Sequence, residues 1–259
     1  MQIPRMLYKY HSFTPTSVGN LATRQVWFSR PTRFNDPFDC AVPPYRNPMP
    51  DSDFARLYQY VRSHCEDPDT LDAQYRPLGP KDPTFRNEVR KGLGHGLEEQ
   101  RFKMQHSRGV CCLSEKNDDL LMWSHYADAH KGFCLGFKTD SEPFASARPV
   151  CYTTEVPVVN PISVLLDQDE NAFWAMILTK FDSWSYEKEW RVFHTEADKL
   201  FGYEKGVLQA VHFGLAMPGS QKIVIGKLLD GTGTHLYEME RDPMKFAVVQ
   251  RSFTFTSTP

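Results

Sequence analysis

Two glutamates separated by a single residue are the first candidates for chemistry in this sequence. Glu187 and Glu189 lie in the segment SWSYEKEWRVF, for which we expect a β-strand over residues 186–194. Side chains alternate along a strand, so Glu187, Glu189 and Arg191 would share one face, with the carboxylates about 7 Å apart. Such a pair can act on two atoms of one substrate, and mutual repulsion raises one of the two pKa values. A solvated strand face with an ordinary ion pair has the same pattern.

A second candidate is the segment DDLLMWSHYADAHKGF, in which we expect a helix over residues 118–130. Helical spacing would place Trp123, Tyr126 and His130 on one stripe and His125 on another face. The five-residue separation of the two histidines does not suit a shared metal ion, because the HExxH arrangement needs a separation of four. We therefore predict no metal site here. Core packing by the two aromatic residues, and capping of the helix by His130, are the alternatives.

The first expected strand and the loop after the second carry further polar candidates. In LYKYH, Tyr8 and Tyr10 face one way while Lys9 and His11 face the other. In RPTRFNDPFD, the polar residues flank a proline, and a side-chain-to-backbone turn explains this pattern without chemistry. A rigid polar loop beside strand ends is also a common place for binding residues, which here would be Asn35 and Asp36.

The elements that must position these residues indicate an α+β protein, because strands and helices do not alternate regularly. We predict one domain over residues 1–259 with a mixed or antiparallel β core. Residues 43–106 would form a mostly helical or irregular insertion, or a lid. The expected strands are 7–11, 26–29, 109–114, 133–137, 150–153, 186–194, 207–213, 223–225 and 246–255. The expected helices are 14–23, 51–64, 84–106, 118–130 and 160–180, with 66–83 irregular.

Composition limits the class of protein. The chain has 259 residues, a net charge of −2 and an aromatic content of 13%. No apolar run approaches the ~20 residues that a membrane span needs, and the first residues do not resemble a signal peptide. Six cysteines without a CxxC pair read as free thiols in a reducing compartment. We therefore expect a soluble cytoplasmic protein without a membrane partner.

The motifs GxGxxG, GxxxxGK[ST] and GxSxG are absent, which disfavours Rossmann, kinase-type and serine-hydrolase chemistry.

Four long motifs, in the order LYKYHSF, VWFSRPTRFNDPFDC, LMWSHYADAHKGFCLGF and WSYEKEWRVF, resemble a mainly bacterial family known as domain of unknown function 2971. The order of strand, short helix, strand and polar loop, with a late Glu-x-Glu, also resembles the ADP-ribosyltransferase superfamily. That resemblance implies a fold with split sheets and NAD as the substrate. It implies that Glu189 is the catalytic carboxylate, that Glu187 is its helper, and that His11 positions the cofactor. The remaining candidates are His125 and His130 for catalysis, and Tyr10, Asn35, Asp36, Trp123, Tyr126 and Arg191 for NAD binding.

The function expected from these observations is that of an NAD-dependent ADP-ribosyltransferase or another NAD-consuming enzyme, such as a bacterial toxin or an antiphage defence effector. A carboxylate beside the ribose would stabilise the oxocarbenium-like state formed as nicotinamide leaves. The acceptor could be a protein, a nucleic acid or a small molecule. One alternative is a metal-dependent nuclease or other hydrolase that uses Asp36, Asp39, Glu187 and Glu189 with His125 or His130. Another is a sensor or adaptor without enzymatic activity.

Overall fold

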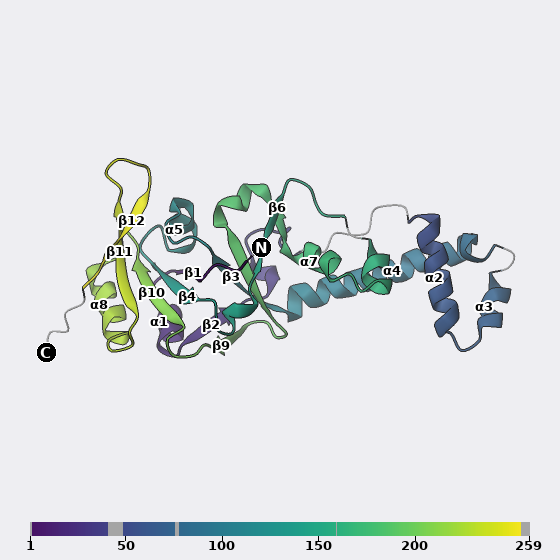
Figure 1. Cartoon of the computed structure of the whole chain (residues 1–259), viewed down its shortest axis with the longest axis horizontal. Helices are drawn as coiled ribbons and strands as arrows, with labels where there is room; N and C mark the ends of the chain where they lie inside the picture. The colour runs from purple at the N-terminus through teal and green to yellow at the C-terminus, as the bar shows by residue number, and fades with distance from the viewer. Residues whose placement is uncertain (1, 41–48, 76–77, 159, 255–259) are drawn as a thin grey trace.

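Eight strands form the main sheet of the molecule, in the order β12-β11-β10-β4-β1-β3-β8-β5 (Figure 1). The computed structural model describes residues 2–40, 49–75, 78–158 and 160–254. Only β10 and β11 pair in parallel within this sheet, so it is mixed, and the α+β prediction is confirmed. Its strands are β1 (Met6–His11), β3 (Gly109–Ser114), β4 (Phe133–Lys138), β5 (Arg148–Pro149), β8 (Glu189–His194), β10 (Leu208–Phe213), β11 (His235–Arg241) and β12 (Val248–Ser252).

Two small sheets flank the main one. β2 (Gln25–Phe28) pairs antiparallel with β9 (Lys199–Gly202), and β6 (Cys151–Thr153) pairs parallel with β7 (Thr179–Phe181). The predicted strand over 246–255 is present as β12, although residue 255 lies outside the described residues. Among the described residues, no helix is both long and apolar enough to cross a membrane.

The main sheet is split between β1 and β3. Although each strand has six residues, they pair with each other only at Tyr8 and Ser114. A carbonyl on a splayed strand has no ladder partner and needs another donor. Lys9 supplies one, because its Nζ donates to the carbonyl oxygen of Cys112 at 3.0 Å. The opening between the two strands is where the pocket described below lies.

Local sequence explains the first helix, which packs beside the split. In α1 (Pro15–Ala22), Thr14 and Ser17 form a capping box, since each side chain accepts from the backbone of the other. Pro15 at the first helical position has its φ already set for a helix. Leu21 then reaches the main core, where it joins Leu7 and Phe137 from the sheet. The short helices η1 (Pro31–Arg33), η3 (Phe144–Ser146) and η4 (Asp182–Glu187) complete this part of the chain.

A helical arm extends from one end of the sheet, opposite β11 and β12 (Figure 1). It consists of α2 (Asp51–His64), α3 (Pro68–Gln74), η2 (Gly79–Lys81), α4 (Pro83–Ser107), α6 (Pro161–Leu166) and α7 (Glu170–Leu178). The predicted insertion is therefore mostly helical, and α2 and α4 match the predicted helices closely. The predicted start of the insertion at residue 43 lies outside the described residues.

Several predicted elements are wrong. The apolar triplet at 223–225 suggested a strand, but it lies within α8 (Gly219–Leu228), whose geometry buries Ile225 and exposes Ile223 and Val224. Residues 66–83 contain α3, which Asp67 caps, as well as η2. The predicted helix over 160–180 breaks at Gln168, whose φ is 52°, and ends before β7. Strands β9 and β11 were not predicted from the sequence.

Candidate functional site

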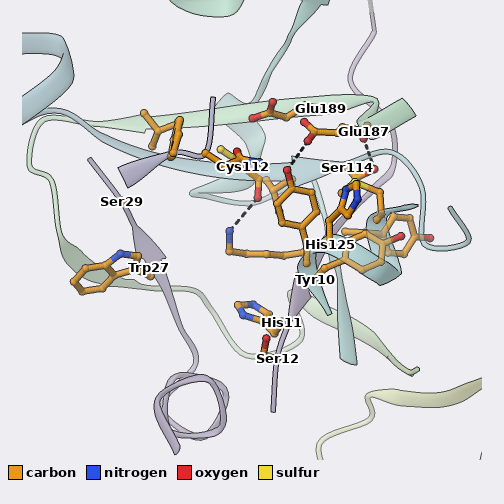
Figure 2. Close-up of a pocket in the computed structure, with 18 of the residues that line it drawn as sticks. Tyr10, His11, Ser12, Trp27, Ser29, Cys112, Ser114, His125, Glu187 and Glu189 are labelled. Atoms are coloured by element: carbon orange, nitrogen blue, oxygen red, sulfur yellow. Dashed lines mark hydrogen bonds between the residues drawn. The ribbon is translucent and has the colours of Figure 1, made fainter. Parts of the chain in front are cut away.

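A pocket with a volume of about 880 Å³ lies where β1 and β3 diverge. Its walls come from β1, α1, β2, the loop after η1, β3 and α5 (Leu120–Tyr126), while β7, η4 and β8 supply charged groups. Figure 2 shows Glu187 and Glu189 on one side of this pocket, with Trp27, His11 and Ser12 on the far side. No described residue of α2, α3 or α4 is among the residues that line the pocket.

Three carboxylates and two cations form a buried network at the floor of the pocket. Lys180 Nζ contacts carboxylate oxygens of Glu187 at 2.5 Å, Glu189 at 3.0 Å and Asp39 at 3.5 Å. Arg191 binds Glu189 through Nε at 2.8 Å and Nη2 at 3.0 Å, and Asp39 through Nη2. All five side chains are at most 4% exposed. With every group ionised, the network has one more negative than positive charge.

The two glutamates differ in their electrostatics. Burial raises the pKa of Glu187, and the negative charge of Glu189 raises it further, which outweighs the opposing effect of Lys180. Burial would also raise the pKa of Glu189, but the charges of Arg191 and Lys180 outweigh it and hold that pKa well below its usual range. This agrees with the expectation that repulsion raises one of the two pKa values. Glu189 is the permanently ionised member of the pair.

The glutamates do not meet through strand alternation. The predicted strand over 186–194 is wrong at its start, because Glu187 ends η4 and β8 begins at Glu189. Between them, Lys188 has a φ of 45°, in the left-handed region. Ser114 Oγ holds this bend by donating to the carbonyl oxygen of Glu187 at 2.6 Å, and the backbone N–H of Glu189 donates to Tyr152 Oη at 2.8 Å. Both carboxylates consequently turn toward Lys180.

Helix α5 brings two of the predicted residues to the pocket. Asp119 caps the helix by accepting from the backbone N–H groups of the first turn. Tyr126 lines the pocket and donates to Glu187 Oε1 at 2.6 Å. His125 also lines the pocket, with its Nδ1 in hydrogen-bond contact with Tyr186 Oη at 3.0 Å. His125 and Tyr126 thus line the same pocket as the two glutamates.

The predicted stripe of Trp123, Tyr126 and His130 does not exist. The helix ends at Tyr126, because Asp128, Ala129 and His130 all have positive φ and form a left-handed turn. Trp123 is fully buried, and its Nε1 donates to the carbonyl oxygen of Asn117. The His130 ring lies parallel to the Trp123 ring, with centroids 6.5 Å apart. Neither Trp123 nor His130 is among the described residues that line the pocket.

The remaining candidates also fall into two groups: some line the pocket, and others lie outside its lining. Tyr10, His11 and Asn35 line the pocket, and Tyr10 Oη is anchored on the carbonyl oxygen of Lys116. Burial, aided by the charge of Lys9, lowers the pKa of His11 to about 3, so its imidazole is neutral at physiological pH. Two others lie outside the lining within the described chain. Asp36 is buried and accepts from the backbone N–H of Phe38, and Arg191 is the fully buried partner of Glu189 and Asp39.

The acidic cluster required by the nuclease alternative is only partly assembled. Asp39, Glu187 and Glu189 meet, but Lys180 and Arg191 occupy their oxygens, and Asp36 and His130 stand apart. Among the described residues, no group of three or more His, Cys, Asp or Glu has a metal-binding arrangement.

Lys180 and Trp27 are among the polar and aromatic residues of the pocket that sequence reasoning missed. Lys180 follows the apolar run AFWAMILT, and a lone lysine there signals a buried cation that needs acidic partners. Trp27 lies on a four-residue strand with alternating burial, in which Val26 and Phe28 face the core. The opposite face of β2 therefore belongs to the pocket, and that alternation was a usable signal.

The fold and the site together define an α+β protein with a carboxylate-floored pocket between splayed strands. Residues 122–192 match the family model described as "Protein of unknown function (DUF2971)", which confirms the resemblance to that family over this segment. The matched segment contains Tyr126, Lys180, Glu187 and Glu189. No curated protein matches the chain. No solved structure matches it either.

Proposed function

We propose that the pocket binds NAD and that the chain cleaves the bond between nicotinamide and ribose, either as an ADP-ribosyltransferase or as another NAD-consuming enzyme. The observation that carries this proposal is a buried carboxylate, Glu187, which is held by Tyr126 and Lys180 at the floor of the pocket. A volume of about 880 Å³ lies within the range of small-molecule and cofactor sites.

The aromatic lining suits a ligand with two flat rings. Tyr10, His125 and Tyr126 line the pocket, and Tyr126 donates to Glu187. Trp27 lies on the far side of the pocket from the glutamates (Figure 2). Aromatic side chains stack on planar rings at low entropic cost. Residues with hydroxyl groups at the start of α1 also line the pocket, as does Arg33, whose guanidinium contacts Asp198 at 3.2 Å and is 59% exposed. These groups are suited to bind a diphosphate.

We assign to Glu187 the role that the sequence resemblance gave to Glu189. Glu189 already accepts three hydrogen bonds from Arg191 and Lys180, and its pKa is lowered, so it serves as the fixed anion behind the site. Glu187 accepts only two, from Tyr126 and Lys180. Its raised pKa also makes it the better proton acceptor of the pair.

The reaction then follows from these charges. The bond between the ribose C1′ and the nicotinamide nitrogen breaks, nicotinamide leaves as a neutral molecule, and the ribose becomes a cation. Glu187 lies beside this developing charge and stabilises it. A water or an acceptor group attacks C1′ and releases its proton to Glu187. The lowered pKa of His11 makes it a neutral hydrogen-bonding group that positions the ligand.

Nicotinamide release from NAD by the purified chain tests the proposal. We expect Glu187→Gln to lower the rate by about 10²–10³-fold, because the variant keeps the shape but loses the charge and the proton acceptor. Glu155→Gln, at an exposed position outside the pocket, is the matched control and should match the wild type. A folded wild-type protein that releases no nicotinamide, or an unchanged rate in Glu187→Gln, would contradict the proposal. NAD binding without turnover would favour the sensor alternative.

The biological role that we propose is that of a toxin or a defence effector that acts by consuming NAD or by modifying an acceptor. Induced expression should deplete cellular NAD or transfer label from NAD to a protein, nucleic acid or small molecule, and Glu187→Gln should abolish both. Growth arrest with unchanged NAD and no labelled acceptor would argue against this role.

A further inference from the structure

The helical arm contains two separate hydrophobic clusters. The tip cluster is built on α2, α3 and the first half of α4, and its buried members are Met49, Phe54, Leu57, Tyr58, Tyr75, Phe85 and Ile162. The base cluster lies next to the sheet, and its buried members are Cys40, Met104, Met176, Ile177 and Leu178. The two share no member among the described residues. The arm is thus a small tip joined to a base, each with a core of its own.

Helix α4 crosses from tip to base at a weak point. Leu93 packs on the tip cluster and Leu97 on the base cluster, so the boundary lies between them. Gly92, Gly94 and Gly96 surround this boundary, and a Cβ at any of the three would meet nothing within 4 Å. Close packing therefore does not require glycine there. What glycine changes at an exposed helical position is the stiffness of the backbone.

The second connection breaks at the same boundary. Leu166 at the end of α6 packs on the tip cluster, whereas Trp174 in α7 packs on the base cluster. Between them, Gln168 has a φ of 52° and Asp169 caps a new helix. Of the two described segments that join tip and base, the α6–α7 connection therefore breaks where the hydrophobic core is interrupted, and α4 continues through the boundary but carries three glycines there. Figure 1 shows α4 and α7 side by side in the base, with α2 and α3 beyond them.

Helix α7 connects this boundary to the pocket. It begins at the break and ends near Ile177, whose carbonyl oxygen accepts from Arg191 Nη1 at 2.9 Å. Three residues later, Lys180 holds Glu187 and Glu189. Any displacement of α7 therefore changes the groups that neutralise the carboxylates of the pocket.

We propose that the arm bends at this boundary and that α7 transmits the bend to the contact between Lys180 and Glu187, so that the position of the tip regulates the pocket. A partner that fixes the tip would hold or release Lys180. The effect on turnover rests on the proposed function, because Lys180 sets the charge and the position of Glu187. The structural coupling between tip and pocket does not depend on which substrate is bound.

Hydrogen–deuterium exchange of the full chain tests the coupling without any substrate. The variant with Gly92→Ala, Gly94→Ala and Gly96→Ala stiffens α4 without a clash. Each substitution should slow local opening on the order of fivefold. We expect slower exchange in residues 90–98, and also in residues 174–181 of α7 and β7. Slower exchange confined to α4 would overturn the proposal.

A control in the same helix separates bending from general helix stability. Asn87→Ala replaces an exposed residue of α4 on the tip side of the boundary and also raises helix propensity. It should leave exchange in residues 174–181 unchanged, and an effect equal to that of the triple variant would overturn the proposal.

Turnover gives an independent readout. Nicotinamide release should fall severalfold in the triple variant, because a stiff arm no longer lets α7 adjust the contact between Lys180 and Glu187 during turnover, and it should be unchanged in Asn87→Ala. Equal rates in all three proteins would overturn regulation by the arm. If the wild type releases no nicotinamide, the proposed function fails, and the exchange experiment alone decides the coupling.

Discussion

Glycines serve opposite purposes in the β body and in the helical arm. In the body, a Cβ at Gly132 would overlap the carbonyl oxygen of His11, and one at Gly214 would overlap the carbonyl oxygen of His130. In the arm, Gly92, Gly94 and Gly96 lie in open space on an exposed helix. In the body, glycine lets strands and turns approach closely. In the arm, there is room for a side chain at each of these three positions, although the sequence has glycine there.

This difference shows where the molecule is rigid. The left-handed turn after α5 presses Gly132 onto the end of β1, next to His11 in the pocket wall. Buried ion pairs then fix Glu187 and Glu189 on the pocket floor. Close-packed interiors transmit small displacements instead of absorbing them. The body is thus suited to hold reacting groups, while the arm is suited to move.

The strongest test of body rigidity is Arg191→Met. This change leaves Glu189 and Asp39 buried with Lys180 as their remaining cation, and removes a donor from the Ile177 carbonyl. Removing one partner of a buried ion pair typically costs about 3–5 kcal/mol. We expect a loss of that size in the free energy of unfolding, measured by chemical denaturation.

An exposed ion pair provides the control for that change. Arg251 contacts Glu240 on the surface, and Arg251→Met should leave the free energy of unfolding close to that of the wild type, because water screens an exposed ion pair. Similar losses in the two variants would mean that burial does not set the strength of the network.

The next largest effect is expected from Gly132→Ala. The added methyl group must displace the carbonyl oxygen of His11 at the end of β1, because an ideal Cβ at Gly132 would overlap that oxygen. Overpacking of this kind costs about 1–3 kcal/mol. Thermal or chemical denaturation should show this loss, and ligand binding in the pocket should weaken because His11 shifts. If Gly132→Ala is as stable as the wild type, close packing does not require glycine at this position, and the difference between body and arm is contradicted.

A buried histidine gives the body a pH dependence. His212 is 2% exposed, its ring is stacked on Tyr237, and burial lowers its pKa from 6.5 to about 4. Below pH 6.5 the unfolded chain therefore binds a proton that the folded chain refuses, so stability falls with pH down to about 4. The slope from this site is about 1.4 kcal/mol per pH unit.

His212→Phe keeps a ring in the stack and removes the titration. The difference between the unfolding free energies of wild type and variant should therefore vary with pH between about 4 and 6.5, and stay constant above this interval. A difference that is independent of pH would show that the pKa of His212 is the same in the folded and unfolded chain, so that burial does not lower it.

Local sequence signals predicted much of the fold. The ends of α2 match the predicted helix because its charge pattern and apolar spacing lie within one segment. The capping box of α1 and the apolar strand β3 are equally local. Helix α8 was mistaken for a strand, because three consecutive apolar residues carry no periodicity that separates the two.

The site was predictable only in part because its assembly is not local. Glu187 and Glu189 were found through their residue types, but the expected alternation is replaced by the left-handed Lys188. Lys180 reaches the two glutamates because β7 pairs with β6, and no sequence pattern near Lys180 predicts that pairing. The same holds for the left-handed turn that removes His130 from the helix, since packing against Gly214 forces it.

The smallest predicted effect separates the two uses of glycine most directly. Gly94→Ala in the arm adds a methyl group to open space and removes the backbone freedom of glycine in the unfolded chain. The variant should therefore be about 0.5–1 kcal/mol more stable than the wild type. Chemical denaturation of Gly94→Ala beside Gly132→Ala should give free-energy changes of opposite sign for the same substitution. Destabilisation by both substitutions would contradict the difference between the glycines of the body and those of the arm.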